Sequence, residues 1–384
     1  MALHMPDYQS AESTVILRAD DLRILVQTIF EQAGCSETEA TCVATHLVDA
    51  DLRGHPSHGV ARVARYVQWL QDDILRANQT ITVEQDTDSF VLIEGNYGFG
   101  QSIGEQAVSI GIEKAQKNGV AVTALKNSGH LGCISDFAEQ AALEGVASIH
   151  FVNVRGSLLV APFGGREARG GTSPICCGIP GPDGVPVVLD FATSKVAEGK
   201  ALVALRGGAK LPDDALIGPS GSSSGDPRLL YGETAESLYP RPGLGEGALT
   251  PFGLHKGSGL NFFAEVFAGA LTGSGTAGAS GEETRRKLCN GMLSIFLSVE
   301  HFQGDDWFAN EVKAYIDFVK SATPIVPGEP VLIPGEKEIA LKQERLASGI
   351  PITKGVWHDI QQAARFVGLS DADMTSVTKA GAQS

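Results

Sequence analysis

The first part of the chain alternates apolar and polar positions with the period of an amphipathic helix. Apolar side chains recur every three to four residues through most of residues 20–75, and residues that favour helix ends interrupt the pattern twice. We therefore predict a predominantly helical portion up to about residue 77. Its three helices are 20–33, with Asp20 as the cap and Gly34 at the end; 36–53, with Ser36 and Glu39 in capping-box spacing and Gly54 at the end; and 60–75.

From residue 89 the pattern changes to short runs of β-branched and apolar residues that alternate with helical stretches. This alternation is typical of an α/β domain whose sheet is covered by helices. Residues 206–250 are rich in glycine, serine and proline, which predicts long surface loops of the kind that serve as lids. The expected strands are 89–95, 119–125, 145–154, 185–191 and 291–299, and the expected helices are 101–118, 134–144 and 259–271.

The last 50 residues return to the helical period, at 335–349 and 354–370. We expect these helices to pack back on the N-terminal ones. A chain of 384 residues suits about two domains.

Composition narrows the classes of function. Forty-five acidic residues against 30 basic ones give a net charge of −15 without a basic run, which argues against nucleic-acid binding. The sequence has no apolar window of membrane-spanning length and does not open like a signal peptide, so we expect no membrane association and a cytoplasmic location. The six cysteines form no CxxC pair, which predicts free thiols and no structural zinc or other metal; they are Cys35, Cys42, Cys133, Cys176, Cys177 and Cys289.

Two glycine-rich stretches are candidates for a dinucleotide-binding motif. Gly98, Gly100 and Gly104 lie between a strand and a helix, but the last interval is one residue too long and no acidic residue follows at the expected distance. The correctly spaced glycines at 273–278 follow a helix and lead into no strand. Neither stretch predicts a Rossmann site, and the absence of GxxxxGK[ST] argues against an ATP-driven enzyme.

The segment DLRGHPSHGVARVARY, residues 51–66, gathers titratable groups between two helices. Ser57 can cap the following helix, which would put His58 in its first turn and Arg62 four residues later on the same face. Arginine suits a substrate carboxylate, and histidine can deliver a proton to a developing alkoxide. The pattern fits recognition of a 2-oxo acid, although a capped helix start with a solvated histidine has the same spacing.

A histidine at a helix N-terminus is disfavoured in its charged form, so His58 would need a carboxylate partner. Asp190 is the candidate, because it ends the apolar strand VPVVLDF, residues 185–191. A solvent-exposed acid at the strand end is the alternative.

Four further segments occur in order after this one: NSGHLGCISDFAEQ at 127–140, APFGGREARGGTSP at 161–174, LDFATS at 189–194 and FGLHKGSGL at 252–260. Together they resemble the type 2 malate/L-lactate dehydrogenase family, which includes sulfolactate, ureidoglycolate and diketogulonate oxidoreductases and cyclic-imine carboxylate reductases. Within it the chain is most similar to the bacterial hydroxycarboxylate dehydrogenase B branch. The resemblance extends in collinear order over nearly the whole chain, to LIPGEKE.

The resemblance implies a nicotinamide-dependent oxidoreductase whose α/β fold is not a Rossmann fold. A mixed-sheet domain, residues 78–335, would bind the cofactor, and a helical domain would be formed from both chain ends, residues 1–77 with 336–384. Family members are typically homodimers with the active site near the domain and subunit boundary. We therefore expect a homodimer.

Residue by residue, the family's Ser-His pair falls on Ser57 and His58, with His58 as the proton donor in reduction. Its arginine falls on Arg62 and its aspartate on Asp190. His130 matches a second histidine that accepts the proton in some members, and the sequence leaves the choice between the two histidines open. Taken alone, His130 would be a loop histidine with satisfied hydrogen bonds.

Cofactor contacts and pocket residues follow from the same resemblance. Lys256 beside two glycines can approach a pyrophosphate closely, although a lone lysine in such a loop is ordinarily solvated. Ser173 replaces the family's usual asparagine and Ser258 departs from the pattern in KGxGL, so hydrogen bonding to substrate or nicotinamide is expected to differ. The expected cofactor residues are Asp190, Phe191, Ala192, His255, Lys256, Gly335 and Glu336, and Thr172 is expected to line the same pocket.

These observations predict reversible hydride transfer between NAD or NADP and a 2-oxo acid or 2-hydroxy acid, with Arg62 holding the carboxylate and His58 donating the proton. One alternative is reduction of a cyclic imine carboxylate such as Δ1-piperideine-2-carboxylate, which needs the same clamp. Another is a noncatalytic ligand-binding protein, which the acidic surface and long loops would permit. The intact set of candidate catalytic residues favours an enzyme.

Overall fold

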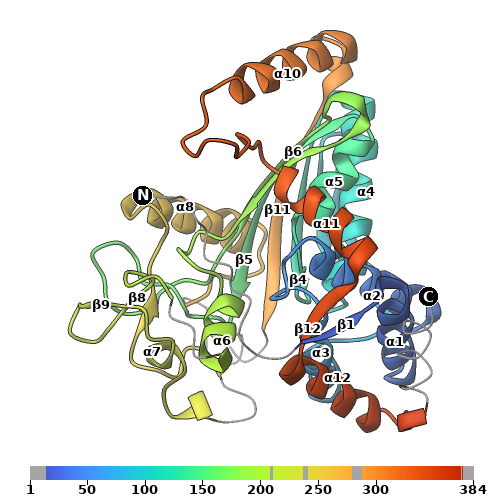
Figure 1. Ribbon diagram of the computed structural model, residues 1–384. Helices are drawn as coiled ribbons and strands as arrows, with labels where there is room; N and C mark the ends of the chain where they lie inside the picture. The colour runs from blue at the N-terminus through green and yellow to red at the C-terminus, as the bar shows by residue number, and fades with distance from the viewer. Residues whose placement is uncertain (1–13, 208–210, 237–240, 279–287, 373, 375–384) are drawn as a thin grey trace.

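The computed structural model describes residues 14–207, 211–236, 241–278, 288–372 and 374. Its central element is a seven-stranded sheet in the order β2-β3-β4-β11-β5-β6-β7 (Figure 1). Only the β3–β4 pair is parallel, so the sheet is mixed, as expected. The strands are β2 (Thr82–Asp86), β3 (Phe90–Glu94), β4 (Val120–Ser128), β5 (Val146–Arg155), β6 (Ile175–Ile179), β7 (Val187–Phe191) and β11 (Cys289–Ser298).

Helices cover both faces of this sheet. On one face α4 (Gly100–Asn118) and α5 (Ser135–Leu143) pack on the central strands. On the other, α8 (His255–Ala264) continues as a π-helical segment (Glu265–Leu271) that contacts β5 and β11 (Figure 1). The central strands β4 and β11 are therefore largely buried, which accounts for their apolar runs.

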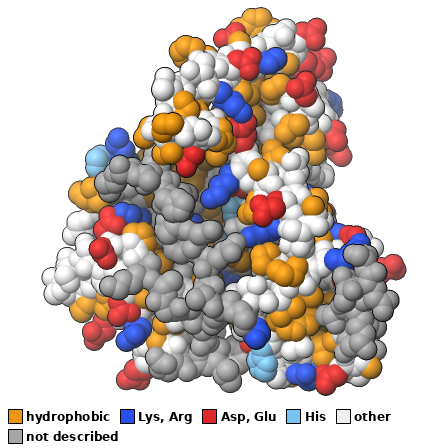
Figure 2. Space-filling model, in the orientation of Figure 1, with side chains coloured by type: hydrophobic (Ala, Val, Ile, Leu, Met, Phe, Trp, Pro, Cys, Tyr) orange, Lys and Arg blue, Asp and Glu red, His pale blue; other side chains and the backbone are white. Residues whose placement is uncertain are grey.

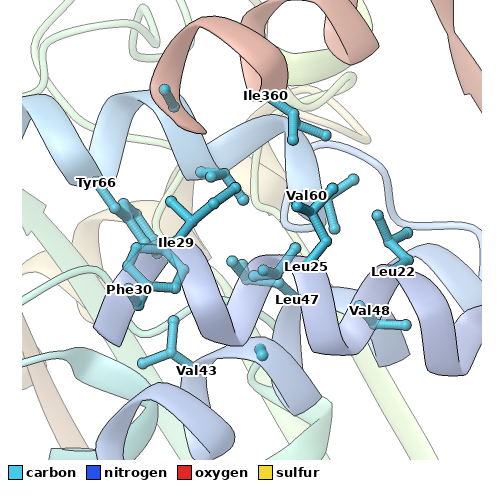
Figure 3. Close-up of a cluster of buried hydrophobic side chains, with 14 of the residues drawn as sticks. Leu22, Leu25, Ile29, Phe30, Val43, Leu47, Val48, Val60, Tyr66 and Ile360 are labelled. Carbon is cyan, nitrogen blue, oxygen red and sulfur yellow. The ribbon is translucent and has the colours of Figure 1, made fainter. Parts of the chain in front are cut away.

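A second hydrophobic core joins the two ends of the chain. Ile360 of α12 lies with Leu25 and Val60 of the N-terminal segment in this core (Figure 3). A short two-stranded antiparallel sheet, β1 with β12, adds to the contact. The C-terminal helices thus pack back on the N-terminal ones as expected. The elements are β1 (Thr14–Leu17), α1 (Ala19–Gln32), α2 (Glu37–Leu52), α3 (Val63–Gln71), α11 (Glu336–Ser348), β12 (Ile350–Thr353) and α12 (Lys354–Phe366).

The helix ends differ from the sequence prediction in detail. The predicted cap Asp20 lies inside α1, which begins after Arg18 without a side-chain cap. Ser36 does cap α2, accepting a hydrogen bond from the Glu39 amide at 3.3 Å. The carboxylate of Glu39 does not return the bond, because it accepts from the Asn78 amide instead.

Residues 206–250 were expected to be surface loops, and the structure differs. Within the described part of this segment Leu211, Leu230 and Tyr231 are buried in a third hydrophobic cluster. The apolar residues that form this small core are spaced among glycines and prolines. The composition of the segment therefore did not predict the core. The elements in and next to it are α6 (Glu198–Gly207), β8 (Leu216–Ile217), β9 (Ser223–Ser224), α7 (Arg228–Tyr231) and β10 (Ala248–Leu249).

Helix α10 (Asp305–Lys320) was not predicted, and it projects away from the body of the molecule (Figure 1). None of its residues is buried. No helix in the described ranges has both the length and the apolar character needed to cross a membrane.

Candidate active site

The turn that carries Ser57 and His58 is held by a buried acid. Asp51, 2 % exposed at the end of α2, accepts a hydrogen bond from the Val60 amide at 2.7 Å. A Cβ atom on Gly59 would lie 2.2 Å from that carboxylate, so this close approach requires glycine. Ser57 is therefore not the helix cap that the sequence predicted, and His58 lies in a turn before the helix. Asp51 performs the capping.

His58 and His130 form the centre of the site. Their rings are parallel within 2° and their centroids are 5.4 Å apart. Burial and the neighbouring Arg62 guanidinium lower the pKa of His58 to about 3, and burial with the same arginine holds the pKa of His130 well below its usual value. Both rings are therefore neutral at pH 7.

Arg62 sits beside the two rings. Its Nε donates to the Ser57 carbonyl at 2.5 Å, and its Nη2 lies 3.6 Å from the Glu198 carboxylate. Glu198 also accepts from the Tyr231 hydroxyl at 3.1 Å. The guanidinium is thus anchored through Nε, and its Nη2 is paired with a carboxylate of the protein.

The structure corrects the expected pairing of His58 with Asp190. Asp190 ends β7 as predicted, but its carboxylate accepts from the Ser135 amide at the start of α5, at 2.9 Å. No hydrogen bond or ion pair joins it to His58 in the described ranges. Burial raises the pKa of Asp190 to about 6. The acid whose charge acts on His58 is Asp136.

Four residues that shape the site were not identified from the sequence: Asp51, Tyr66, Gln101 and Glu198. Tyr66 is the last residue of the segment 51–66, yet its hydrogen-bond partner His130 is 64 positions further along the chain. A contact between residues so far apart in the chain leaves no periodic pattern in the sequence. Only the position of Asp51, at the end of a helix whose next turn needs a cap, offered a local signal.

The glycines rejected as a nucleotide motif pack helix α4 against this site. A Cβ atom on Gly100 would lie 2.3 Å from the His130 carbonyl oxygen, and one on Gly104 would lie 2.3 Å from the Phe137 ring. These glycines let α4 approach the loop that carries His130.

A hydrogen-bond network joins the residue after Phe191 and Ala192 to Thr172 and to helix α8. Thr193, which follows Phe191 and Ala192, donates to the Thr172 carbonyl at 2.9 Å and accepts from Asn261 at 2.8 Å. Asn261 belongs to α8, and the helix begins at His255 and Lys256, both exposed. Lys256 is thus in the first turn of a helix rather than in a loop.

Gly335 and Glu336 lie at the other side of β7. Gly335 (φ +90°) rests against Val188, and together with Asp190 it lines a cavity of about 390 Å³. Glu336 is held by Lys320 and by the Ile333 amide. Its carboxylate therefore stabilises the start of α11.

The two departures from the family pattern serve packing. Ser173 is fully buried and donates to the Glu265 carboxylate at 2.9 Å, and Ser258 accepts from the Phe163 amide at 2.9 Å. The Ser173 hydroxyl hydrogen is thus taken up by Glu265, whereas Ser258 acts as an acceptor in its bond with Phe163. The expectation that hydrogen bonding to substrate or nicotinamide differs stays a prediction.

A second polar cluster connects α2 with α4 and α5. Cys42, His46 and Glu105 have potential metal-ligand atoms within 4.8 Å of one another, an arrangement that the search for paired cysteines did not reveal. His46 contacts both Glu105 at 2.8 Å and Asp136 at 2.9 Å, and these acids raise its pKa to about 12. A protonated His46 makes this cluster an ion-pair network. All six cysteines are free thiols.

Comparison with known proteins identifies the family of the chain. Residues 17–361 match the family model of malate/L-lactate dehydrogenase. The chain belongs to this family. It is 37% identical to hydroxycarboxylate dehydrogenase B of Escherichia coli K12, over 92% of this chain and 94% of that one.

Solved structures of family members superpose on nearly the whole chain. A structure from E. coli assigned to the malate/lactate dehydrogenases has a TM-score of 0.85 at 35% identity, covering 95% of this chain and 99% of that one. Sulfolactate dehydrogenase from Methanocaldococcus jannaschii gives 0.79 at 30%, with coverage of 94% and 99%. A Δ1-piperideine-2-carboxylate reductase from Pseudomonas syringae gives 0.77 at 27%, with coverage of 91% and 100%. The fold is therefore the expected sulfolactate dehydrogenase-like one.

Proposed function

We propose that this protein transfers a hydride reversibly between NAD or NADP and a 2-oxo acid or 2-hydroxy acid. The observation that carries the proposal is the pair of neutral histidine rings beside the anchored guanidinium of Arg62. An anion clamp next to a proton-exchanging ring is the minimum set that a 2-hydroxy acid needs. Membership in a family of hydroxyacid dehydrogenases supports it.

In the oxidation direction the neutral ring of His58 takes the hydroxyl proton, while Arg62 holds the carboxylate. In reduction the ring must first be charged. Burial and the positive charge of Arg62 oppose that charging in the free protein. A bound substrate carboxylate offsets the arginine, so substrate binding raises the pKa of His58 and prepares it to donate.

The residues present fit a nicotinamide dinucleotide. Lys256 is exposed in the first turn of α8, and a Cβ atom on Gly259 one turn later would meet nothing within 4 Å. A helix N-terminus with a free ammonium and open space suits a pyrophosphate. Phe191, Ala192, Thr172 and His255 would hold the remainder, with Asp190 and Gly335 at the neighbouring cavity. The bound cofactor supplies the hydride.

Reduction of a cyclic imine carboxylate is the second candidate, favoured by the similarity to the P. syringae reductase. Arg62 would serve in the same way. A protonated imine already carries its proton, so this reaction would depend less on His58.

Turnover of NADH and NADPH with a panel of pyruvate, oxaloacetate, phenylpyruvate, 2-oxoglutarate and Δ1-piperideine-2-carboxylate distinguishes the two candidates. We expect strong turnover of an open-chain 2-oxo acid with one of the cofactors. Turnover of the imine alone would favour the second candidate. No turnover and no change in cofactor fluorescence on adding protein would contradict both.

We also propose that the protein is a homodimer. Exposed aromatic side chains gather on α8 and α10, and apolar residues are visible on the α10 projection in Figure 2. Trp307, Tyr315 and Phe318 of α10 are 56 to 74% exposed, and on α8 Phe262 is 64% exposed. Uncovered aromatic patches of this kind mark interfaces between subunits.

Sedimentation equilibrium should give twice the chain mass of 40.3 kDa. Replacing Trp307 and Phe318 together by serine should shift the mass toward that of the single chain, because both side chains would lie in the interface. A wild-type protein that sediments as a single chain at micromolar concentration would contradict the dimer.

A further inference from the structure

A hydrogen-bonded chain of three side chains lies beneath the site. The Tyr66 hydroxyl is 2.6 Å from Nδ1 of His130, and the Gln101 amide donates to the same hydroxyl at 3.2 Å. Gln101 is fully buried and Tyr66 is 1 % exposed. The three residues come from α4, α3 and the loop after β4, and Tyr66 belongs to the core that joins the two ends of the chain.

The contacts of the Tyr66 hydroxyl indicate where the hydrogen of His130 lies. A tyrosine hydroxyl carries one hydrogen, and a neutral imidazole carries one on either Nδ1 or Nε2. The Gln101 amide donates to the Tyr66 oxygen, and Nδ1 of His130 is the one acceptor that the described contacts offer to the hydroxyl hydrogen. The ring hydrogen of His130 is therefore on Nε2, the one nitrogen that Tyr66 leaves for a ligand.

We infer that Tyr66 and Gln101 are positioning residues that hold His130 as a fixed neutral hydrogen-bond donor to the substrate oxygen, and that His58 is the ring that exchanges the proton. This division of roles rests on the proposed dehydrogenase function. It decides between the two histidines, which the sequence left open.

The surroundings of the two rings support the division. His130 faces the positive groups Arg62 and Arg65 as well as His58, and no acid is among the charges that act on it. His58 faces Arg62 and His55, but also the carboxylate of Asp136. Two stacked rings cannot both be charged at this distance, and the one near an acid takes the proton at lower cost.

The hydrogen bonds of the two Nδ1 atoms also support His58 as the ring that exchanges the proton. Nδ1 of His58 is buried without a hydrogen-bond partner in the described ranges, whereas Nδ1 of His130 is occupied by Tyr66. No neighbour therefore fixes the tautomer of His58, and its ring is free to gain and lose a proton during turnover.

The reaction balances with these roles. In reduction the hydride forms the new C–H bond, the carbonyl π electrons become an O–H bond, and the proton for that bond leaves His58. His130 keeps its own hydrogen and stabilises the developing negative charge on oxygen. His58 then regains a proton from solvent. Oxidation follows the same steps in reverse.

The decisive measurement is the tautomer of His130 in the intact wild-type chain, read from ¹⁵N-histidine NMR and assigned by the missing signals in His130→Gln. We expect hydrogen on Nε2. Hydrogen on Nδ1 would overturn the proposal. The spectrum does not depend on turnover, so it tests the positioning even if the panel of 2-oxo acids gives no reaction.

Tyr66→Phe tests the same point by kinetics. The ring stays to pack on Phe30 and Phe99, so the fold should persist. We expect kcat to fall by at least about 10-fold with little change in KM, because a donor in the transition state loses its orientation. The tautomer signal of His130 should become mixed.

The pH at which kcat/KM changes should stay that of the wild type, since His58 is intact. Tyr97→Phe removes a hydroxyl that accepts from Arg155, which is not one of the candidate site residues, and it is the matched control, with wild-type kinetics. A Tyr66→Phe variant with wild-type kcat would overturn the proposal, as would one whose pH profile moves.

Discussion

The variant His58→Ala is expected to lose turnover of 2-oxo acids by about 10²- to 10⁴-fold, the usual contribution of a positioned general acid or base. Affinity for NADH or NADPH, read by fluorescence, should remain near the wild-type value, because His58 is not among the proposed cofactor contacts. His58 is only half-buried in a turn that Asp51 holds, so the fold should tolerate the change.

The control is His358→Ala, which removes an exposed histidine on α12 and should leave kinetics unchanged. Equal turnover in His58→Ala and wild type would remove His58 from the mechanism. A loss of cofactor affinity as large as the loss of turnover would instead assign it a binding role.

The pH dependence of the wild type follows from the same residue. Because the pKa of His58 is lowered to about 3, the ring stays neutral well below its ordinary titration range. The value of kcat/KM for oxidation of a 2-hydroxy acid reports the free enzyme. It should therefore show no fall near pH 6.5 as the pH is lowered, whereas an ordinary histidine base would lose activity there.

The variant Arg62→Ala should lower kcat/KM for a 2-oxo acid by about 10²- to 10³-fold, mainly through KM. A buried charged pair that loses one partner typically costs a few kcal/mol of binding. Arg62→Lys keeps the charge without the planar fork and should recover part of the loss. Removing the positive charge should also raise the pKa of His58, because Arg62 helps to depress it.

The ethyl ester of pyruvate provides the control for this variant, since it lacks the carboxylate. Arg62→Ala should reduce the ester with a kcat/KM at least equal to that of the wild type, because the ester offers Arg62 no carboxylate and the variant lacks the charge that lowers the pKa of His58. If the variant lost the same factor with ester and acid, the role of Arg62 would be structural, through its contacts with Ser57 and Glu198.

Local patterns in the sequence predicted most of the regular elements. Ser36 does cap α2, and the strand that ends at Asp190 is β7. Short or edge elements such as β1, β2 and β6 were missed, because four or five residues give little periodicity and their pairing is decided by distant neighbours. Helix α10 was missed although its pattern is amphipathic, with acids in its first turn and Lys320 in its last.

The site was predicted in part. The segment 51–66 and His130 were identified, and the structure brings His58, Arg62 and His130 together. Their partners were not predictable, because Tyr66, Gln101 and Glu198 reach the site only through the packing of α3, α4 and α6. The predicted pairing of Asp190 with His58 is wrong for the same reason, because the Asp190 carboxylate accepts a hydrogen bond from the backbone amide at the start of α5. The boundaries 1–77, 78–335 and 336–384 stay predictions.

Direct hydride transfer is the central claim, and isotope transfer tests it most directly. NADH or NADPH deuterated at C4 of the nicotinamide ring would be incubated with the 2-oxo acid that turns over best, and the 2-hydroxy acid product analysed by mass spectrometry and proton NMR. We predict deuterium bound to the carbon that carries the new hydroxyl. A product with no deuterium at that carbon would contradict the proposed function.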